Sequence, residues 1–347
     1  MSTPLRIAVV GCGDISALHF TAIAGQNNVT LVAVCDVDEG RLAAASQSHG
    51  VPGFTNHRQM LDELTPDVVH ICTPHNTHAA LAIDALDRGV SVVLEKPVAH
   101  TRDEATRLVD AAKRSDASIA VCFQNRYNAP VQAAAEILAT GAVGTVHGAA
   151  ATVIWHRSAE YYQDRPWRGR WSTGGGGLLM NQAIHTLDLV QWLMGPVTSV
   201  RGSASTRFLD DVIEVEDTAD MVLTHESGAR SVFYTTLAYV ANAPVTLEIV
   251  AENATLRLCG DLTVTWADGR VETVRERALP TGERAYWGIS HELLIADFYQ
   301  RVQTGSSFWI DPAEARKSFD IIQDIYDQSF PERAGRARQA TERKALT

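Results

Sequence analysis

The sequence has few positive charges, few aromatic residues and few cysteines, and it contains no long apolar run. Lys and Arg total 30 against 41 Asp and Glu, which gives a net charge of −11. This deficit argues against a nucleic-acid or membrane-surface partner, because both favour a basic face. No apolar segment has the length that spans a bilayer, and the N-terminus carries no signal-peptide pattern. We therefore expect a cytoplasmic protein.

The cysteines are odd in number and scattered, and no pair has the spacing of a metal site or a redox motif. We expect reduced thiols that pack as small hydrophobic side chains, and no metal site. With 347 residues, of which 46% are hydrophobic and 20% charged, the chain is long enough for two domains with separate cores. The five cysteines are Cys12, Cys35, Cys72, Cys122 and Cys259.

One stretch near the N-terminus organises the first half. The apolar run Ile7–Val10 leads into Gly11 and Gly13, and a helical pattern follows over Ile15–Ala24. A strand, a glycine turn and a helix N-terminus form a pyrophosphate site, because the backbone approaches the ligand closely and free N–H groups face its charge. Ser16 replaces the third glycine of the usual fingerprint, so this stretch alone is equally compatible with an ordinary strand–turn–helix corner.

A second buried strand is expected over Val29–Cys35, and it ends on Asp36. An acid at this point accepts hydrogen bonds from the ribose hydroxyls and repels a 2′-phosphate, which favours NAD over NADP. Asp36 is also placed to cap the helix expected over Glu39–Ser48, and the two roles are compatible.

Three more apolar runs, Asp67–Cys72, Val90–Leu94 and Ser118–Phe123, alternate with helical patterns. This alternation predicts a doubly wound parallel sheet, whose ligands bind at the carboxyl ends of the strands. Two kinds of residue follow these strands: the histidines of the Thr73–His78 loop and the lysine of Glu95–Pro97. Loop histidines and a Glu-Lys-Pro turn are often purely structural, so these positions do not identify a site by themselves.

After Gln124 the pattern changes. Strands rich in Val, Thr and aromatic residues begin at Gly144–Trp155, and strands joined by short turns run from Val197 to Leu262, which predicts a mainly antiparallel sheet. Such a sheet leaves one face to be covered, so a partner subunit is expected. Closing helices are predicted over Ser290–Thr304 and Pro312–Ser329. We accordingly divide the chain into a dinucleotide-binding domain (1–123), a substrate and oligomerisation domain (124–330) and a polar, mobile tail (331–347).

The loop Trp155–Trp171 is dense in Arg, Tyr and Trp, which suits a recognition surface because these side chains combine stacking area with hydrogen-bond donors. A crossing loop fixed by aromatic packing is the alternative.

A glycine run at 174–177 then opens a helix expected over Leu178–Met194. Asn181, His185 and Asp188 are spaced to share one face of that helix. A lone histidine in such a helix is usually a core residue, but a His and Asn stripe after a glycine-rich turn is harder to explain by packing alone.

Together these motifs resemble the glucose–fructose oxidoreductase/inositol dehydrogenase (Gfo/Idh/MocA) family, and the resemblance extends to about Phe330. It implies a Rossmann domain followed by an open, mostly antiparallel sheet domain with helices on one face, with catalysis between the two. It also implies an NAD cofactor, for which we expect contacts from Gly11, Gly13, Asp14, Ile15, Asp36, Thr73, Pro74, His75, His78, Glu95, Lys96 and Gln124.

The resemblance further implies that Lys96 and His185 are catalytic and that the Lys96–Pro97 peptide bond is cis. Members similar to inositol dehydrogenase carry Asp where this chain has Asn181. Because Asn takes no proton at neutral pH, we expect Asn181 to orient the substrate hydroxyl or Lys96. These three residues are also expected to contact the substrate, together with Arg126, Tyr127, Trp155, Arg157, Tyr161, Tyr162, Trp167 and Arg168.

The expected reaction is hydride transfer between a secondary alcohol of a sugar, anhydrosugar or cyclitol and NAD. One alternative is a nucleotide-sugar or anionic-sugar dehydrogenase, which the loop arginines favour; another is a reductase of a different substrate. A third is an NAD(P)-binding transcriptional regulator without turnover, which Asn181 favours and the presence of Lys96 and His185 disfavours. We expect a homo-oligomer, a dimer or tetramer, formed through the C-terminal sheet.

Overall fold

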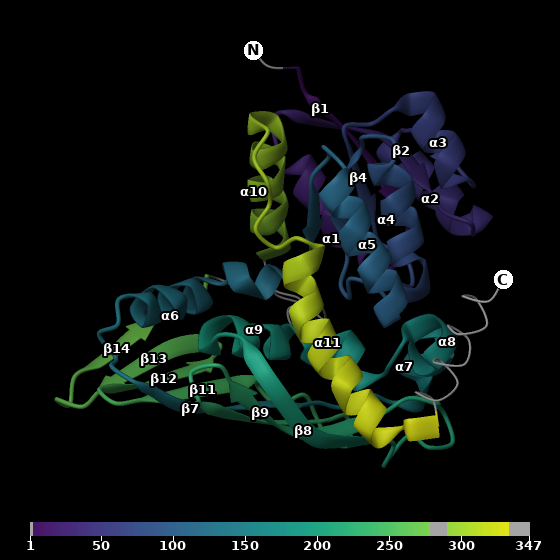
Figure 1. Cartoon of the computed structure of the whole chain (residues 1–347). Coiled ribbons are helices and arrows are strands. Elements are labelled where there is room, and N and C mark those ends of the chain that lie inside the picture. The colour runs from purple at the N-terminus through teal and green to yellow at the C-terminus, as the bar shows by residue number, and fades with distance from the viewer. Residues whose placement is uncertain (1–2, 278–289, 333–347) are drawn as a thin grey trace. The chain divides into compact units, whose positions relative to one another are not determined.

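The computed structural model describes residues 3–277 and 290–332, which form two compact units (Figure 1). The first unit takes its described residues from Met1–Asn128 and Arg277–Arg316, and the second from Ala129–Glu276 and Lys317–Thr347. The chain therefore returns to the first unit near its C-terminal end. The predicted polar tail lies, from residue 333 on, outside the described residues.

The first unit contains a six-stranded parallel sheet in the order β3-β2-β1-β4-β5-β6. This is the strand order of the dinucleotide-binding Rossmann fold, which places its ligand where the order reverses, between β1 and β4. The predicted doubly wound sheet is confirmed. Its strands are β1 (Leu5–Val10), β2 (Val29–Cys35), β3 (Gly53–Phe54), β4 (Val68–Ile71), β5 (Ser91–Leu94) and β6 (Ile119–Val121).

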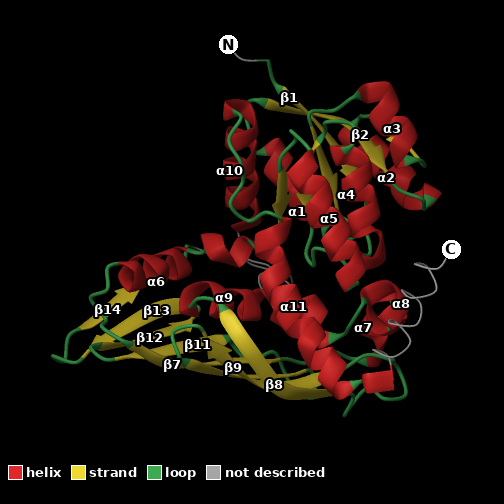
Figure 2. Ribbon diagram, viewed as in Figure 1, coloured by secondary structure: helices red, strands yellow, loops and turns green. Residues whose placement is uncertain are grey.

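Helices flank this sheet, so its central strands are buried on both faces (Figure 2). Every residue of β4 and β5 is buried, and β1 is buried except at Arg6. Helix α10, which comes from the C-terminal part of the chain, packs on α1. The helices are α1 (Ser16–Ala24), α2 (Glu39–His49), α3 (His57–Leu64), α4 (His78–Leu86), α5 (Arg102–Arg114), α10 (Ser290–Thr304) and the short 3-10 turns η1 (His75–Thr77) and η2 (Gln124–Tyr127).

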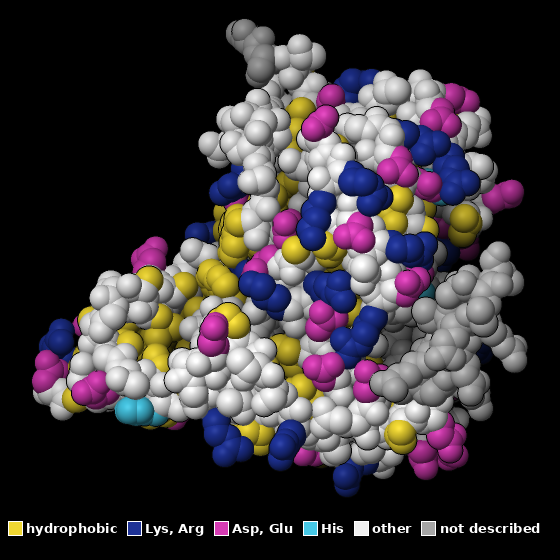
Figure 3. All heavy atoms as spheres, in the orientation of Figure 1, with side chains coloured by type: hydrophobic (Ala, Val, Ile, Leu, Met, Phe, Trp, Pro, Cys, Tyr) yellow, Lys and Arg dark blue, Asp and Glu magenta, His cyan; other side chains and the backbone are white. Residues whose placement is uncertain are grey.

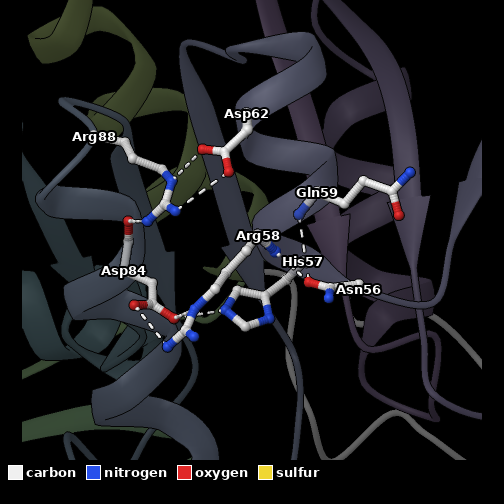
Figure 4. A network of polar contacts seen from close by, with 7 residues as sticks. All are labelled: Asn56, His57, Arg58, Gln59, Asp62, Asp84 and Arg88. Atoms are coloured by element: carbon white, nitrogen blue, oxygen red, sulfur yellow. Dashed lines mark hydrogen bonds and ion pairs between the residues drawn. The ribbon is translucent and has the colours of Figure 1, made fainter.

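The segment between α2 and β4, which no sequence pattern assigned, forms the edge strand β3 and the helix α3. Asn56 caps α3, because its Oδ1 accepts the N–H groups of Arg58 (2.9 Å) and Gln59 (3.3 Å). Asp84 of α4 then accepts from His57 Nε2 (2.7 Å) and Arg58 Nε (2.8 Å), as Figure 4 shows. These polar contacts join α3 to α4 at the surface.

The second unit is built on an eight-stranded sheet in the order β14-β13-β12-β11-β7-β10-β9-β8. Within the described residues its neighbouring strands pair antiparallel, except β7 and β10, which pair in parallel. The mostly antiparallel sheet is thus confirmed. Its strands are β7 (Val146–Ile154), β8 (Val197–Ser205), β9 (Thr218–His225), β10 (Arg230–Thr236), β11 (Thr246–Ala251), β12 (Ala254–Cys259), β13 (Asp261–Trp266) and β14 (Val271–Val274).

Helices cover one face of this sheet, with α6 against β12–β14 and α9 against β7 (Figures 1 and 2). The strand register places four exposed apolar side chains on the opposite face: Val232, Tyr234, Val250 and Val271. The remaining helical elements are α6 (Ala129–Ala139), α7 (Ala159–Gln163), η3 (Pro166–Gly169), α8 (Trp171–Gly174), the π-helical turn η4 (Leu179–Ala183), α9 (Ile184–Met194) and α11 (Pro312–Ser329).

The surface and the thiols agree with the composition. On the face drawn in Figure 3, basic and acidic side chains are interspersed, without a continuous basic area among the described residues. All five cysteines are free, and three of them are buried, as expected for thiols that pack as hydrophobic side chains. Among the helices of residues 3–277 and 290–332, none has both the length and the apolar character needed to cross a bilayer.

Candidate active site

The glycine turn after β1 contains two glycines, one required by the fold and one that is a candidate for ligand binding. Gly11 has a φ of +92°, and a Cβ there would lie 2.6 Å from the carbonyl oxygen of Cys72, so the turn itself requires this glycine. A Cβ on Gly13 would meet no atom within 4 Å. The packing of the fold does not require a glycine at this position, which fits a place where a ligand approaches the backbone.

Helix α1 starts directly after this turn. Its N-cap residue Ile15 provides no side-chain cap, and the hydroxyl of Ser16 instead donates to the Gly13 carbonyl oxygen (2.6 Å). The N–H groups and the positive end of the helix dipole are a favourable environment for an anion. The turn and the helix N-terminus, with Asp14 between them, therefore fit the pyrophosphate of a dinucleotide.

Asp36 is held beside the glycine turn at the end of β2. Its Oδ2 accepts the N–H of Cys12 (2.8 Å) and its Oδ1 accepts the N–H of Asp38 (2.8 Å). Asp36 thus lies at the end of β2, the position from which an acid of a Rossmann fold accepts hydrogen bonds from a ribose. The cap of α2 is Asp38, which accepts the N–H of Arg41 (2.9 Å). Arg41, which the sequence motif did not include, also places its Nε 3.5 Å from Asp36 Oδ2.

The loop after β4 is tied to the turn after β5. His78 is fully buried, with Nδ1 2.7 Å from the Pro97 carbonyl oxygen and Nε2 2.9 Å from that of Thr73. Burial lowers the pKa of His78. His75 of the same loop is also buried, next to Pro74. These histidines thus support the loop from inside, and the expected cis bond between Lys96 and Pro97 is confirmed.

Glu95 faces the core. Its Oε1 accepts hydrogen bonds from His19 Nε2 (3.0 Å) and His291 Nε2 (3.1 Å). Burial would raise the pKa of Glu95, but these hydrogen bonds outweigh it and hold that pKa well below its usual range. Sequence reasoning missed these histidines. The one available signal was His70, a polar residue inside the apolar run of β4, because a buried polar group needs a partner.

The turn η2 carries two of the expected substrate residues. Arg126 is fully buried, with Nη2 3.0 Å from Glu314 Oε1 and its guanidinium 5.4 Å from the centre of the Trp309 ring. Tyr127, which is partly exposed, donates its hydroxyl to Asp297 Oδ2 (2.6 Å) and accepts from Trp309 Nε1 (2.8 Å). Both side chains thus have partners within the first unit, and a buried guanidinium needs such a partner. Gln124, at the start of η2, is buried too.

In the second unit the expected helix after the glycine run is interrupted. The π-helical turn η4 comes first and carries Asn181, and α9 then begins with Ile184 and His185. Asn181 and His185 are both partly exposed, whereas Asp188 is buried. Wider turns of this kind inside helices occur frequently at functional sites, because they change the direction of the side chains that follow.

Glu216 fastens this turn, although no sequence pattern singled it out. Its Oε2 accepts the N–H of Gly177 (2.9 Å), and its Oε1 accepts the N–H of Leu179 (2.8 Å) and the hydroxyl of Tyr326 (2.8 Å). A Cβ on Gly177 would lie 2.0 Å from the Glu216 carbonyl oxygen, so the backbones are in close contact. Burial raises the pKa of Glu216 to about 7 despite the three donors.

The Arg- and aromatic-rich loop forms an alternating stack. The guanidinium of Arg157 lies 5.0 Å from the ring centre of Trp155 and 5.3 Å from that of Tyr161. Arg168 lies 4.6 Å from the Tyr161 ring and 5.5 Å from the Trp167 ring. Cation–π stacking of this kind holds the rings and the guanidinium groups in fixed relative positions.

The stack is joined to the π-helical turn. Gln182, the neighbour of Asn181, donates to the Tyr161 hydroxyl (3.2 Å). Arg157, a member of the stack, is buried, and so is Tyr162, whose ring meets that of Tyr161 edge-on at 5.1 Å. The expected substrate residues that are partly exposed in this loop are Trp155, Tyr161, Trp167 and Arg168.

A Rossmann sheet with a glycine turn, a helix N-terminus without a side-chain cap and an acid after β2 defines a class of protein, the NAD-dependent oxidoreductases. The model of the oxidoreductase family with an NAD-binding Rossmann fold matches residues 5–123, and that of the GFO/IDH/MocA C-terminal domain matches residues 131–257. The chain belongs to the Gfo/Idh/MocA family of oxidoreductases.

Named relatives and solved structures agree with this assignment. The D-apiose dehydrogenase of Paraburkholderia graminis is 32% identical over 259 residues, which cover 73% of this chain and 67% of that protein. The D-glucoside 3-dehydrogenase of Escherichia coli is 29% identical over 199 residues, which cover 56% of this chain and 55% of that protein. The WlbA dehydrogenase of Bordetella pertussis, solved with NADH and UDP-GlcNAcA, is 30% identical with a TM-score of 0.81, covering 93% of this chain and 95% of that one.

Proposed function

We propose that the protein transfers a hydride between a secondary alcohol of a sugar, anhydrosugar or cyclitol and NAD, with His185 and Lys96 as the catalytic residues. The observation that carries the proposal is the second-unit site. His185 and Asn181 lie partly exposed on an interrupted helix that Gln182 joins to a stack of partly exposed rings. Apolar faces of sugar rings pack on aromatic rings, and their hydroxyls need donors and acceptors beside them.

In this mechanism His185 removes the proton of the reacting hydroxyl, because an imidazole titrates near the working pH. The ammonium of Lys96 donates a hydrogen bond to the same oxygen and stabilises its developing negative charge. Asn181 orients the hydroxyl or Lys96, since an amide takes no proton. Asp36 holds the adenosine ribose, and the turn at Gly13 holds the pyrophosphate. Bound NAD supplies the hydride acceptor.

A nucleotide sugar is the second candidate substrate. The WlbA dehydrogenase was solved with such a ligand, UDP-GlcNAcA. In this chain Arg168, partly exposed between the Tyr161 and Trp167 rings, supplies positive charge in the same loop. Other relatives are named for apiose, glucosides and myo-inositol, which are uncharged.

A screen of NADH formation tests the proposal. Inositols, pyranoses, anhydrosugars, uronates and nucleotide sugars are offered with NAD⁺ or NADP⁺ to the wild type, His185→Ala and Lys96→Ala. Loss of a general base or of alkoxide stabilisation lowers kcat by about 10²- to 10⁴-fold. Lys113→Ala is the matched control, because Lys113 is an exposed lysine on α5. Tight NADH binding without turnover of any compound contradicts the proposal and favours a regulator.

We also propose that the uncovered face of the second sheet mediates association into a dimer or tetramer. Val232, Tyr234, Val250 and Val271 share this face and are at least 41% exposed. Apolar side chains gathered on one sheet face favour burial against a second copy. Light scattering should give a multiple of the chain mass, and Tyr234→Glu should lower it. A monomeric wild type contradicts this assembly.

A further inference from the structure

The turn that carries Lys96 is held from both sides by buried groups. Between Ser91 and Ala99, Lys96 is the one residue that is not buried. On its N-terminal side, Glu95 accepts two imidazole hydrogen bonds. On its C-terminal side, the Pro97 carbonyl oxygen contacts His78 Nδ1 (2.7 Å). The backbone on either side of Lys96 is therefore fixed.

A chain of hydrogen bonds runs from Glu95 through the core of the first unit. His19 contacts Glu95 through Nε2 and His70 through Nδ1 (2.8 Å between the two Nδ1 atoms). His70 Nε2 lies 2.7 Å from the hydroxyl of Tyr299, and His291 makes the second bond to Glu95. All five side chains belong to residues that are at most 5% exposed. Four elements, α1, β4, α10 and the end of β5, meet in this chain.

One arrangement of protons satisfies every bond of the chain. Glu95, as a carboxylate, accepts from the Nε2–H groups of His19 and His291. A neutral His19 then has an acceptor at Nδ1, so His70 donates to it through Nδ1–H. His70 Nε2 is left as the acceptor for the Tyr299 hydroxyl. Burial lowers the pKa of both His19 and His70 and raises that of Tyr299, which agrees with neutral groups.

His291 makes the second contact with Glu95. Its Nε2 lies 3.1 Å from Glu95 Oε1, and its Nδ1 is buried without a hydrogen-bond partner among the described residues. Among the described residues, Glu95 is therefore the hydrogen-bond partner that orients this ring.

Two buried thiols also adjoin Glu95. The pKa values of Cys72 and Cys122 lie well above the usual range, first through burial and then through the charge of Glu95, so both thiols stay protonated. Lys96 is the next residue in the chain after Glu95.

We propose that Glu95 is a positioning residue for Lys96: its carboxylate, fixed by His19 and His291, holds the turn that carries Lys96 and places a negative charge next to that lysine in the chain. The inference rests on the proposed function, in which Lys96 acts on the substrate oxygen, and it names what tunes that lysine. The chain through His70 to Tyr299 sets the tautomer of His19, so it secures the bond from His19 to Glu95.

The test measures the pKa of Lys96 without any substrate, by competitive acetylation of the full-length protein at a series of pH values and mass spectrometry of the lysine peptides. Glu95→Gln keeps an acceptor oxygen but removes the charge. We expect the pKa of Lys96 to fall by about one unit, as for loss of a nearby opposite charge. The alkaline limb of the kcat/KM profile should move by the same amount. Lys113 is the reference within each sample and should not change.

Asp84→Asn is the matched control variant, because it removes another acid with an imidazole partner from the same unit. It should leave the pKa of Lys96 unchanged. Tyr299→Phe is a milder variant that removes the donor to His70, and it should shift Lys96 in the same direction by a smaller amount. In the wild type, ¹⁵N NMR should show neutral rings with the proton on Nε2 of His19 and on Nδ1 of His70.

The inference is overturned by an unchanged Lys96 pKa in folded Glu95→Gln, or by a charged or reversed tautomer of His19 or His70. These results differ from a failure of the proposed function. Absence of turnover together with a shifted Lys96 supports the inference and contradicts the function. If Lys96→Ala abolishes turnover but the pKa of Lys96 is unchanged in Glu95→Gln, the result supports the proposed function and contradicts the inference.

Discussion

Two glutamates, one in each unit, are buried to a similar degree yet have opposite pKa shifts. Glu95 is 5% exposed and accepts from two imidazole rings, whereas Glu216 is fully buried and accepts from two backbone N–H groups and the hydroxyl of Tyr326. Burial pushes both pKa values upward. The pKa of Glu95 nevertheless lies well below its usual range, while that of Glu216 rises to about 7.

The difference lies in what surrounds each carboxylate. An imidazole is itself a base, so a proton added to the cluster around Glu95 goes to a histidine before it goes to the carboxylate. Backbone amides and a phenol offer only dipoles at ordinary pH, so a proton added near Glu216 goes to Glu216. Glu95 is therefore suited to carry a permanent charge beside Lys96. Glu216 is suited to tie a turn together in either protonation state.

Glu216→Ala tests the structural role with the largest expected effect. It leaves the buried N–H groups of Gly177 and Leu179 and the Tyr326 hydroxyl without their acceptor. Loss of several buried hydrogen bonds at once should lower the free energy of unfolding by about 4 kcal/mol. Urea unfolding followed by circular dichroism measures the change. Glu214→Ala is the control, because Glu214 is exposed two positions away, and it should stay within about 0.5 kcal/mol.

If Glu216→Ala lowered the free energy of unfolding by less than about 1 kcal/mol, other contacts would hold the glycine turn. Glu216 and Glu95 would then differ only in their charge.

The fold could be predicted because its signals are local. The glycine turn after β1, the acid after β2 and the alternation of strands and helices lie within short stretches, and the helices α10 and α11 begin and end at the predicted residues. The short β3 and the helix α3 were missed because a strand of two residues and a helix of eight residues, with only Met60 and Leu61 buried, give too short a pattern to assign. The parallel pairing of β7 with β10 joins strands far apart in the chain.

The partners of the two buried glutamates were beyond sequence reasoning for the same physical reason. His291 lies 196 positions from Glu95, and Tyr326 lies 110 positions from Glu216. A hydrogen bond between such residues is set by the packing of whole elements, which no local spacing encodes. The same holds for Arg126, whose partners Glu314 and Trp309 lie far along the chain and are brought to it by the fold.

Glu216 and Glu95 should also differ in how their contributions to stability depend on pH, and this effect is expected to be of intermediate size. Because the folded pKa of Glu216 lies above its unfolded value, its contribution is complete below the unfolded pKa and is lost as pH rises through about 7. Glu95 has the opposite sign: its contribution is present at neutral pH and is lost on acidification. We expect the Glu216 contribution to fall by about 3 kcal/mol from pH 5 to pH 8.

Urea midpoints at several pH values, followed by circular dichroism, measure this slope. Glu216→Gln should remove it, whereas Glu214→Gln should retain it. If the slope were unchanged in Glu216→Gln, another group would be responsible for the loss of stability near pH 7. Glu216 and Glu95 would then not differ in the sign of their pH dependence.

The smallest effect is expected at Asp84, which has partners like those of Glu95 but lies near the surface (Figure 4). It accepts from His57 and Arg58, and its side chain is 19% exposed. Burial opposes ionisation, but the hydrogen bonds from Arg58 and His57 lower the pKa of Asp84, so its contribution is lost on acidification. Because water solvates these charges in the unfolded chain and nearly as well in the folded one, Asp84→Asn should cost at most about 1 kcal/mol, and less in high salt. Asp62→Asn, at the more exposed pair with Arg88, should cost less still. The same urea titration measures the change. If Asp84→Asn lowered the free energy of unfolding as much as Glu216→Ala does, the difference in burial would not explain the difference between these clusters, and the charged partners alone would determine the loss.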